Sequence, residues 1–171
     1  IYDEWVQFAK AAPDGVMHIS QFGVEAARQA GYKAHLLTVG VNRNEFFPPR
    51  AGEKAEIRKK LEIPEKAFVW GMMAMNQGRK NIPGTLQAFK EFALDKPAYL
   101  VLDMDPVSGG GWNIPSLCRE FNIPPDRIRF RDAFIKVGIQ DLRSRYCALD
   151  FHSVLAFREG FGLPHLEAMA C

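Results

Sequence analysis

Short apolar runs alternate with amphipathic segments along the chain. Six runs have the length of a β-strand, at 15–19, 35–41, 67–74, 98–104, 128–130 and 148–155. Two segments between them have helical features: 21–30, which Ser20 can cap and Gly31 can end, and 82–93, where apolar residues recur every three or four positions after Asn81. Because the strand-length runs are apolar almost throughout, they predict a parallel sheet covered by helices on both faces. The predicted fold class is therefore α/β, with a Rossmann-like doubly wound parallel sheet.

A polar stretch with two prolines interrupts this alternation at 42–52. Its sequence is NRNEFFPPRAG, and a helix-like segment follows it at 53–61. Such a composition is typical of an interdomain linker. We predict that 1–41 is the C-terminal part of one α/β domain, that 42–52 is the linker, and that 53–171 is a Rossmann-like domain. We also expect truncation at both ends, because the sequence opens without Met and stops inside a helix-like segment.

Composition and charge are those of an ordinary globular protein. Apolar residues make up 47% of the 171 residues, and no apolar run approaches the ~20 residues needed to span a bilayer. The net charge is only +2 and the basic residues are scattered among acids, so we expect no nucleic acid partner. Three cysteines without a C-x-x-C pair favour a reducing compartment, and we expect a cytoplasmic protein.

The sequence lacks the common signatures of cofactor and metal sites. It contains no G-x-G-x-x-G fingerprint, no G-x-x-x-x-G-K-[ST] phosphate loop and no G-x-S-x-G elbow, and its four histidines lack metal-ligand spacing. We therefore expect neither a metal nor a bound cofactor. Three consecutive glycines, at 109–111, lie in a stretch at 106–113 that we interpret as a flexible loop, with a substrate-side loop as the alternative.

The most informative segment is 150–171, DFHSVLAFREGFGLPHLEAMAC. A strand led by Asp150 runs into a loop and then a helix, and Glu159 and Glu167 lie eight positions apart around GFGLP. This pattern resembles the E-x7-E signature of glycosyltransferase family 4 and its GT-B relatives. The resemblance implies a GT-B fold in which this chain supplies mostly the C-terminal, nucleotide-sugar-binding domain.

The chemistry of the GFGLP loop agrees with this resemblance. Two glycines allow positive φ and a close approach of the main chain to a ligand, and Pro164 suits the first turn of a helix. Free N–H groups at a helix start favour an anion, here a diphosphate. We expect donor contacts from Gly160, Phe161, Gly162 and Leu163.

The two acids of the motif have separate roles in the family. The second one holds the nucleotide ribose, which implies this role for Glu167, and a carboxylate can accept two hydroxyl hydrogen bonds. The first one faces the donor sugar, which implies a catalytic role for Glu159. The alternative for either acid is to stabilise the helix start alone, by about 0.3–1 kcal/mol.

Earlier segments are similar to the same family. The helix after Ser20, the linker sequence VGVNRNEFFP and the strand and loop FVWGMMAMNQGRKN each have a counterpart there. Lys80 matches a Lys that grips the donor diphosphate. The Arg that accompanies it in relatives is missing, because Ala74 and Met75 stand in that region, and Arg79 is the candidate substitute.

Two further comparisons with the family concern donor binding. The main chain near Phe134 falls where relatives surround the nucleobase, so we expect it to contact the base. Leu155 and Ala156 replace a Pro-Ser pair that relatives commonly have before the first motif acid. This departure concerns donor geometry and not the fold.

The resemblance implies a retaining glycosyltransferase that transfers a hexose from a nucleoside diphosphate sugar to a hydroxyl acceptor. The acceptor would be a sugar, a lipid-linked sugar or a protein, and the missing domain would allow peripheral membrane contact. The alternative is a non-catalytic nucleotide-sugar-binding fragment that lacks the acceptor domain. A nucleotide-dependent oxidoreductase is disfavoured by the missing glycine fingerprint.

Overall fold

The chain forms two units, each with its own secondary structure. The structure is a computed structural model that describes all residues except 1, 13, 108–109 and 131–137. One unit comprises Ile1–Gly40 and Glu159–Leu163, and the larger one comprises Val41–Arg158 and Pro164–Cys171. The boundaries predicted from the sequence for the two domains and the linker remain a prediction.

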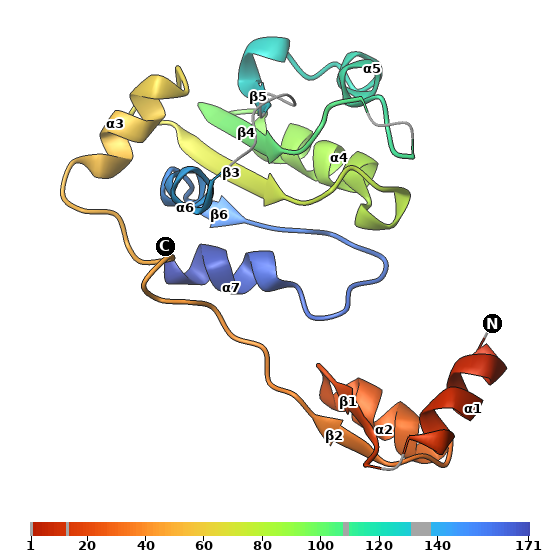
Figure 1. Ribbon diagram of the computed structural model, residues 1–171. Helices are drawn as coiled ribbons and strands as arrows, with labels where there is room; N and C mark the ends of the chain where they lie inside the picture. Colours follow the sequence, from red (N-terminus) through yellow and green to blue (C-terminus); the bar gives the residue numbers. More distant parts are fainter. Residues whose placement is uncertain (1, 13, 108–109, 131–137) are drawn as a thin grey trace. The chain divides into compact units, whose positions relative to one another are not determined.

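A four-stranded parallel sheet forms the centre of the larger unit (Figure 1). Its order is β5-β4-β3-β6, with β3 at Phe68–Met73, β4 at Ala98–Asp103, β5 at Ile128–Phe130 and β6 at Phe151–His152. The helices are α3 (Glu53–Lys60), α4 (Ile82–Ala93), α5 (Ile114–Glu120), α6 (Ile139–Cys147) and α7 (Leu163–Ala170), and two short 3-10 helices are η1 (Gly78–Lys80) and η2 (Pro125–Arg127). The doubly wound parallel sheet predicted from the sequence is confirmed.

The core lies on both faces of this sheet because successive strand residues point to opposite sides. On one face, Trp70 and Met72 pack with Leu86 of α4 and Ile114 of α5. On the other face, a second cluster includes Val69 and Met73 of β3, Val101 of β4, Tyr146 of α6, and Phe46, which precedes α3. Near-continuous apolar strands are therefore required, since each strand residue meets one of two buried layers.

Most of the strands that pair are shorter than the apolar runs that predict them. The run at 148–155 yields only β6, which pairs Phe151 with Trp70 and His152 with Gly71. Ala148 instead caps the end of α6, so part of the run belongs to a helix end. In the described part of the chain, β6 is an outer strand of the sheet.

The smaller unit is a β-α-β arrangement preceded by a helix. Its elements are α1 (Tyr2–Ala11), β1 (Val16–His18), α2 (Gln21–Gln29) and β2 (Ala34–Leu36), and β1 and β2 are parallel. Ser20 Oγ accepts a hydrogen bond of 3.1 Å from the Gly23 amide at the start of α2, and Gly31 has a φ of +80° just after its end. The helix boundaries predicted from Ser20 and Gly31 are therefore confirmed.

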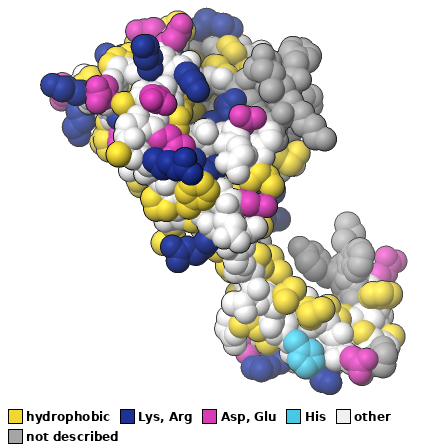
Figure 2. Space-filling model, turned by 60° about the vertical axis from the view of Figure 1, so that its left-hand side comes forward, with side chains coloured by type: hydrophobic (Ala, Val, Ile, Leu, Met, Phe, Trp, Pro, Cys, Tyr) yellow, Lys and Arg dark blue, Asp and Glu magenta, His cyan; other side chains and the backbone are white. Residues whose placement is uncertain are grey.

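Surface charge on the larger unit is mixed. On the face shown in Figure 2, Lys and Arg side chains lie among Asp and Glu side chains and do not form one basic patch. In the described residues, no helix has the length and apolar character needed to cross a membrane. Among the described residues, that face therefore has no basic patch of the kind that binds nucleic acid.

An ion pair joins the start of α3 to α6. Arg143 Nη1 lies 2.6 Å from Glu53 Oε1, and the same guanidinium donates to the carbonyl oxygens of Phe47 and Pro48 at 3.1 Å each. The hydrogen bond from Arg143 lowers the pKa of Glu53 from 4.5 to about 2. The buried guanidinium of Arg143 therefore joins the segment that precedes α3 to α6.

This ion pair predicts an acid-dependent loss of stability. Because the pKa of Glu53 is lower in the folded state, its contribution is complete above pH 4.5 and is lost as the pH falls towards about 2. We expect Glu53→Gln to unfold at lower urea concentration than the unsubstituted chain at pH 7, and the difference to shrink as the pH falls through this window. Glu56→Gln, an exposed change on the same helix, is the control. A difference that stays constant with pH would contradict the assignment.

Candidate functional site

The crevice of a doubly wound sheet lies where the strand order reverses, outside the carboxyl ends of the strands. Here β4 lies on one side of β3 and β6 lies on the other, so the reversal falls between β3 and β6. The two loops that meet this position are the one after β3, at 74–81, and the one after β6, from 153 onward. Lys80 and Arg79 belong to the first loop, and Glu159 follows the second.

The loop after β3 ends in η1 and then enters α4. The Lys80 amide donates to the Gln77 carbonyl at 3.0 Å, which closes the turn. Asn81 follows with a φ of 50°, and its Oδ1 accepts a hydrogen bond of 3.3 Å from the Gly84 amide at the helix start. Lys80 is only 7% exposed, so its ammonium group is confined by its surroundings. A fixed cation beside a helix start is the environment that a diphosphate requires.

Arg79 joins the two loops. Its carbonyl oxygen accepts a hydrogen bond of 2.9 Å from the Phe157 amide, and its Nη1 donates to the Arg158 carbonyl at 3.0 Å. Its Nε also donates to Gln77 Oε1 at 3.2 Å. Arg79 thus holds the end of the β6 loop against the β3 loop, a role that the sequence did not indicate. Its predicted contact with phosphate remains a prediction.

The segment Glu159–Leu163 has a tight local conformation. Gly162 has a φ of 81°, which favours glycine, and α7 begins at the next residue with Pro164 in its first turn. The Gly160 amide donates to Glu159 Oε1 at 3.2 Å. The prediction of positive φ was correct for Gly162 and wrong for Gly160, because only Gly162 immediately precedes the helix and must reverse the chain there.

Glu167 on α7 has a partner that the sequence did not reveal. The Tyr146 hydroxyl donates a hydrogen bond of 2.6 Å to Glu167 Oε2, and Tyr146 is 3% exposed between Phe46 and His152. Burial and this hydrogen bond raise the pKa of Tyr146, so it remains a donor at neutral pH. The other oxygen of the carboxylate can accept a further hydrogen bond. The pair spans 21 positions and two helices, a relation that no local spacing signals.

Asp150 is a structural residue. Its carboxylate accepts hydrogen bonds from Lys54 Nζ at 2.8 Å, from Arg58 Nη2 at 2.6 Å and from the Val69 amide at 2.9 Å. Burial would raise the pKa of Asp150, but these bonds outweigh it and the pKa lies below its ordinary value. The aspartate that leads the strand in sequence therefore anchors the start of β6 to α3 and β3.

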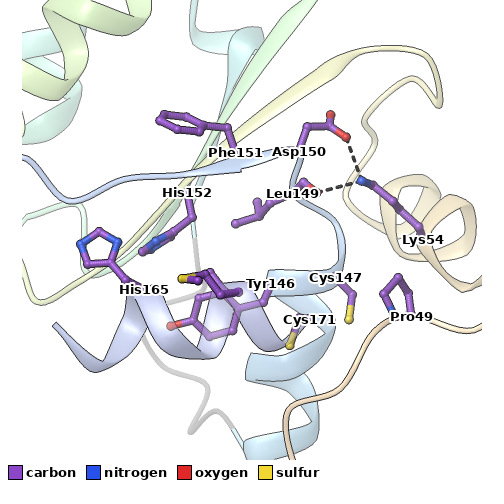
Figure 3. A pocket seen from close by; sticks show the side chains of 12 residues that line it. Pro49, Lys54, Tyr146, Cys147, Leu149, Asp150, Phe151, His152, His165 and Cys171 are labelled. Carbon is purple, nitrogen blue, oxygen red and sulfur yellow. Dashed lines mark hydrogen bonds and ion pairs between the residues drawn. The ribbon is translucent and has the colours of Figure 1, made fainter. Parts of the chain in front are cut away.

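A cavity of about 380 Å³ lies between α6, β6 and α7 (Figure 3). The rings of His152 and His165, which both line it, pack edge to face with centroids 5.0 Å apart, and burial lowers the pKa of His152 to about 4. Lys54 and Asp150 form its opposite side. None of the predicted donor-binding residues that the structure describes lines this cavity, so it is not the predicted site.

The expected nucleobase contact and the expected lack of a metal are not tested by the described residues. Phe134, the residue expected to contact the nucleobase, lies outside the described residues. Among the residues described, no group of three or more His, Cys, Asp or Glu side chains is arranged to hold a metal ion. The expectation that no metal is required remains a prediction.

The fold is that of the GT-B glycosyltransferases, in which the larger unit corresponds to the Rossmann-like C-terminal domain. Sucrose-phosphate synthase from Thermosynechococcus elongatus has a TM-score of 0.78 at 24% identity, over 98% of this chain and 41% of that chain. HepE from Anabaena, in complex with UDP-glucose, has a TM-score of 0.82 at 19% identity, over 99% and 46%. The C-terminal domain of LpcC, a glycosyl transferase group 1 family protein from Francisella tularensis, has a TM-score of 0.64 at 23% identity, over 77% and 66%.

The chain therefore spans less than half the length of the first two of these proteins. A scan against protein-family models and a search of curated proteins found no match. The structural comparison establishes the fold, and the activity is inferred from the residues at the switch point.

Proposed function

We propose that this chain is the nucleotide-sugar-binding part of a retaining glycosyltransferase of family 4. The parent protein would transfer a hexose from a nucleoside diphosphate sugar to a hydroxyl acceptor. The observation that carries the proposal is the segment from Glu159 to Glu167, which follows the switch-point strand of a GT-B fold and leads into a helix. HepE, which has the same fold, is a complex with UDP-glucose, and this supports a nucleoside diphosphate sugar as donor.

The chemical requirement of such a transfer is stabilisation of charge. Negative charge grows on the leaving diphosphate as the bond to the sugar breaks, and preorganised cations and amides stabilise that charge most effectively. We assign this task to Lys80 and the main-chain amides of 160–163, with Arg79 as a second cation and the main chain at Phe134 beside the base. These groups need no metal.

The two motif acids would divide the donor between them. Glu167, oriented by Tyr146, would bind the ribose hydroxyls, and Glu159 would act at the sugar where the bond breaks. The acceptor would be bound mainly by chain outside this sequence, and the protein would act in the cytoplasm with peripheral membrane contact through that part. Since sucrose-phosphate synthase and HepE are each more than twice as long as this chain, we expect the transfer itself to require the complete polypeptide.

Substitution of the two acids tests the proposal. Ribose hydrogen bonds exist equally in the ground and transition states, so Glu167→Ala should weaken binding of UDP or GDP. Loss of hydrogen bonds to a charged group, about 1.5–3 kcal/mol, corresponds to roughly a ten- to hundredfold rise in Kd. Glu159→Gln should leave this Kd nearly unchanged and should lower kcat of the complete enzyme. Calorimetric titration with UDP, GDP and NAD measures both effects on binding.

Glu91→Ala, an exposed change on α4, is the control for general effects of removing a carboxylate. Equal weakening in the Glu159 and Glu167 variants would reject the division of roles. Tight binding of NAD, with none of either nucleoside diphosphate, would reject the glycosyltransferase proposal in favour of an oxidoreductase.

A further inference from the structure

The loop that follows β4 contains the glycines at 109–111, which the proposed function does not use. Asn76, in the loop that follows β3, reaches this second loop. It is a buried polar residue, 5% exposed, at the carboxyl edge of the sheet. The two loops are neighbours there because β3 and β4 pair in parallel register as far as Met73 and Asp103.

The side chain of Asn76 makes three hydrogen bonds to the main chain of the second loop. Its Nδ2 donates to the Asp105 carbonyl at 3.0 Å and to the Trp112 carbonyl at 2.7 Å, and its Oδ1 accepts from the Trp112 amide at 2.8 Å. Both amide hydrogens of Asn76 are thereby used. The contact with Trp112 reproduces the paired hydrogen bonds of an antiparallel strand pair.

The second loop is also closed on itself. The Ile114 amide donates to the Pro106 carbonyl at 2.9 Å, and Val107 and Asn113 form an antiparallel bridge. A Cβ at Gly111 would lie 2.3 Å from both the carbonyl oxygen and Oδ1 of Asn76, so no other residue fits against it. These contacts hold Trp112 against Asn76 and leave no room for a side chain at Gly111, while the interpretation of the whole stretch as a flexible loop remains a prediction.

The same contacts fix the loop that precedes Lys80. Asn76 is followed by Gln77, whose carbonyl accepts the Lys80 amide at 3.0 Å and whose Oε1 accepts Arg79 Nε at 3.2 Å. The turn that carries both candidate phosphate ligands thus begins at the residue joined to the β4 loop. Without the Asn76 side chain, the start of this turn would lose the three hydrogen bonds that join it to the loop after β4.

We propose that Asn76 is a positioning residue for the donor diphosphate. It joins the β3 loop to the loop at 105–113 and so holds the Gln77–Lys80 turn in the conformation that presents Lys80 to the phosphates. This inference rests on the proposed function. It assigns to the glycine-containing loop a supporting role in donor binding, carried by its main chain, and accounts for a glycine at 111.

A double-mutant cycle with Lys80 tests the proposal in the 171-residue chain. Coupled neighbours deviate from additivity, and we expect Asn76→Ala to raise the Kd for UDP or GDP about tenfold alone but to add less than about twofold in a chain that already carries Lys80→Ala. Asn76→Gln keeps the amide donors and acceptor one methylene further from the main chain and introduces no charge, so its Kd should lie between those of the unsubstituted chain and Asn76→Ala. This milder variant keeps the test valid if Asn76→Ala does not fold.

Asn122→Ala is the control. Asn122 is exposed and follows α5 with a φ of 56°, which alanine adopts less readily, so this change outside the loop should lower the melting temperature without changing Kd. If the Asn76 variants lower the melting temperature but bind UDP and GDP as the unsubstituted chain does, the positioning role is wrong. Fully additive effects of Asn76 and Lys80 would also overturn it. Failure of the unsubstituted chain to bind either nucleotide would overturn the proposed function, and this inference with it.

Discussion

Lys80→Ala should lower turnover of the complete glycosyltransferase by roughly 10²–10³, the usual loss when one preorganised group that stabilises developing negative charge is removed. Lys80 is buried at the end of η1, directly before α4, so its ammonium group cannot be replaced by solvent as readily as one at the surface. The diphosphate is also charged before the bond breaks. The 171-residue chain should therefore bind UDP or GDP more weakly as well.

Steady-state kinetics of the complete polypeptide and calorimetry of this chain measure the two effects. Lys66→Ala is the matched control, because Lys66 is exposed and lies just before β3, at the opposite edge of the sheet from the crevice. If turnover and affinity both fall less than about threefold in Lys80→Ala, Lys80 does not bind the diphosphate, since loss of a group that stabilises the transition state lowers turnover far more.

Asp150→Ala should have the largest effect on stability, a decrease of about 3 kcal/mol in the free energy of unfolding. Removing one partner of a buried ion pair typically costs about 3–5 kcal/mol, because the remaining charge is left without its counter-ion. The lower end applies here for two reasons. The Asp150 side chain remains 28% exposed, and Arg58 keeps hydrogen bonds to the carbonyl oxygens of Glu65, Ala67 and Ala148.

Urea denaturation at pH 7 measures this change. Asp141→Ala, which removes an exposed carboxylate from α6, is the control and should change stability by less than about 0.5 kcal/mol. If Asp150→Ala is no less stable than Asp141→Ala, the network around Arg58 does not hold β6 to α3. Replacing both partners, as in Arg58→Met with Asp150→Ala, should cost less than the sum of the two single changes, because the double variant no longer contains the buried Arg58 guanidinium without its counter-ion, and the Lys54 side chain is 37% exposed and can be hydrated.

The class of fold was predictable because it depends on a pattern that repeats along the chain. Parallel strands covered on both faces require long apolar runs such as those that became β3 and β4, and the N-cap of α2 requires a side chain such as Ser20. These signals act over a few residues. The extent of β6 was not predictable, since an apolar run does not show where the neighbouring strand stops pairing.

The candidate site was predictable only as a set of residue types at given spacings. Sequence alone placed Glu159 and Glu167 around a glycine-containing loop and Lys80 before a helix, because those positions follow one another along the chain. It gave Arg79 one possible ligand, whereas the structure uses its guanidinium to join the loops that follow β3 and β6. A long side chain can satisfy several partners, and local sequence does not choose among them.

The sequence by itself determined the alternation of strands and helices and the parallel character of the sheet, since both follow from the pattern of apolar residues along the chain. It also determined the acids of the E-x7-E motif, which are defined by their spacing. The tertiary structure alone decided which distant groups meet: Tyr146 with Glu167, Asp150 with Arg58, and Asn76 with the main chain of Trp112. These hydrogen bonds join residues between 21 and 92 positions apart. They form because packing of the sheet and helices brings buried donors and acceptors together, and a buried polar group must find a partner where the fold provides one.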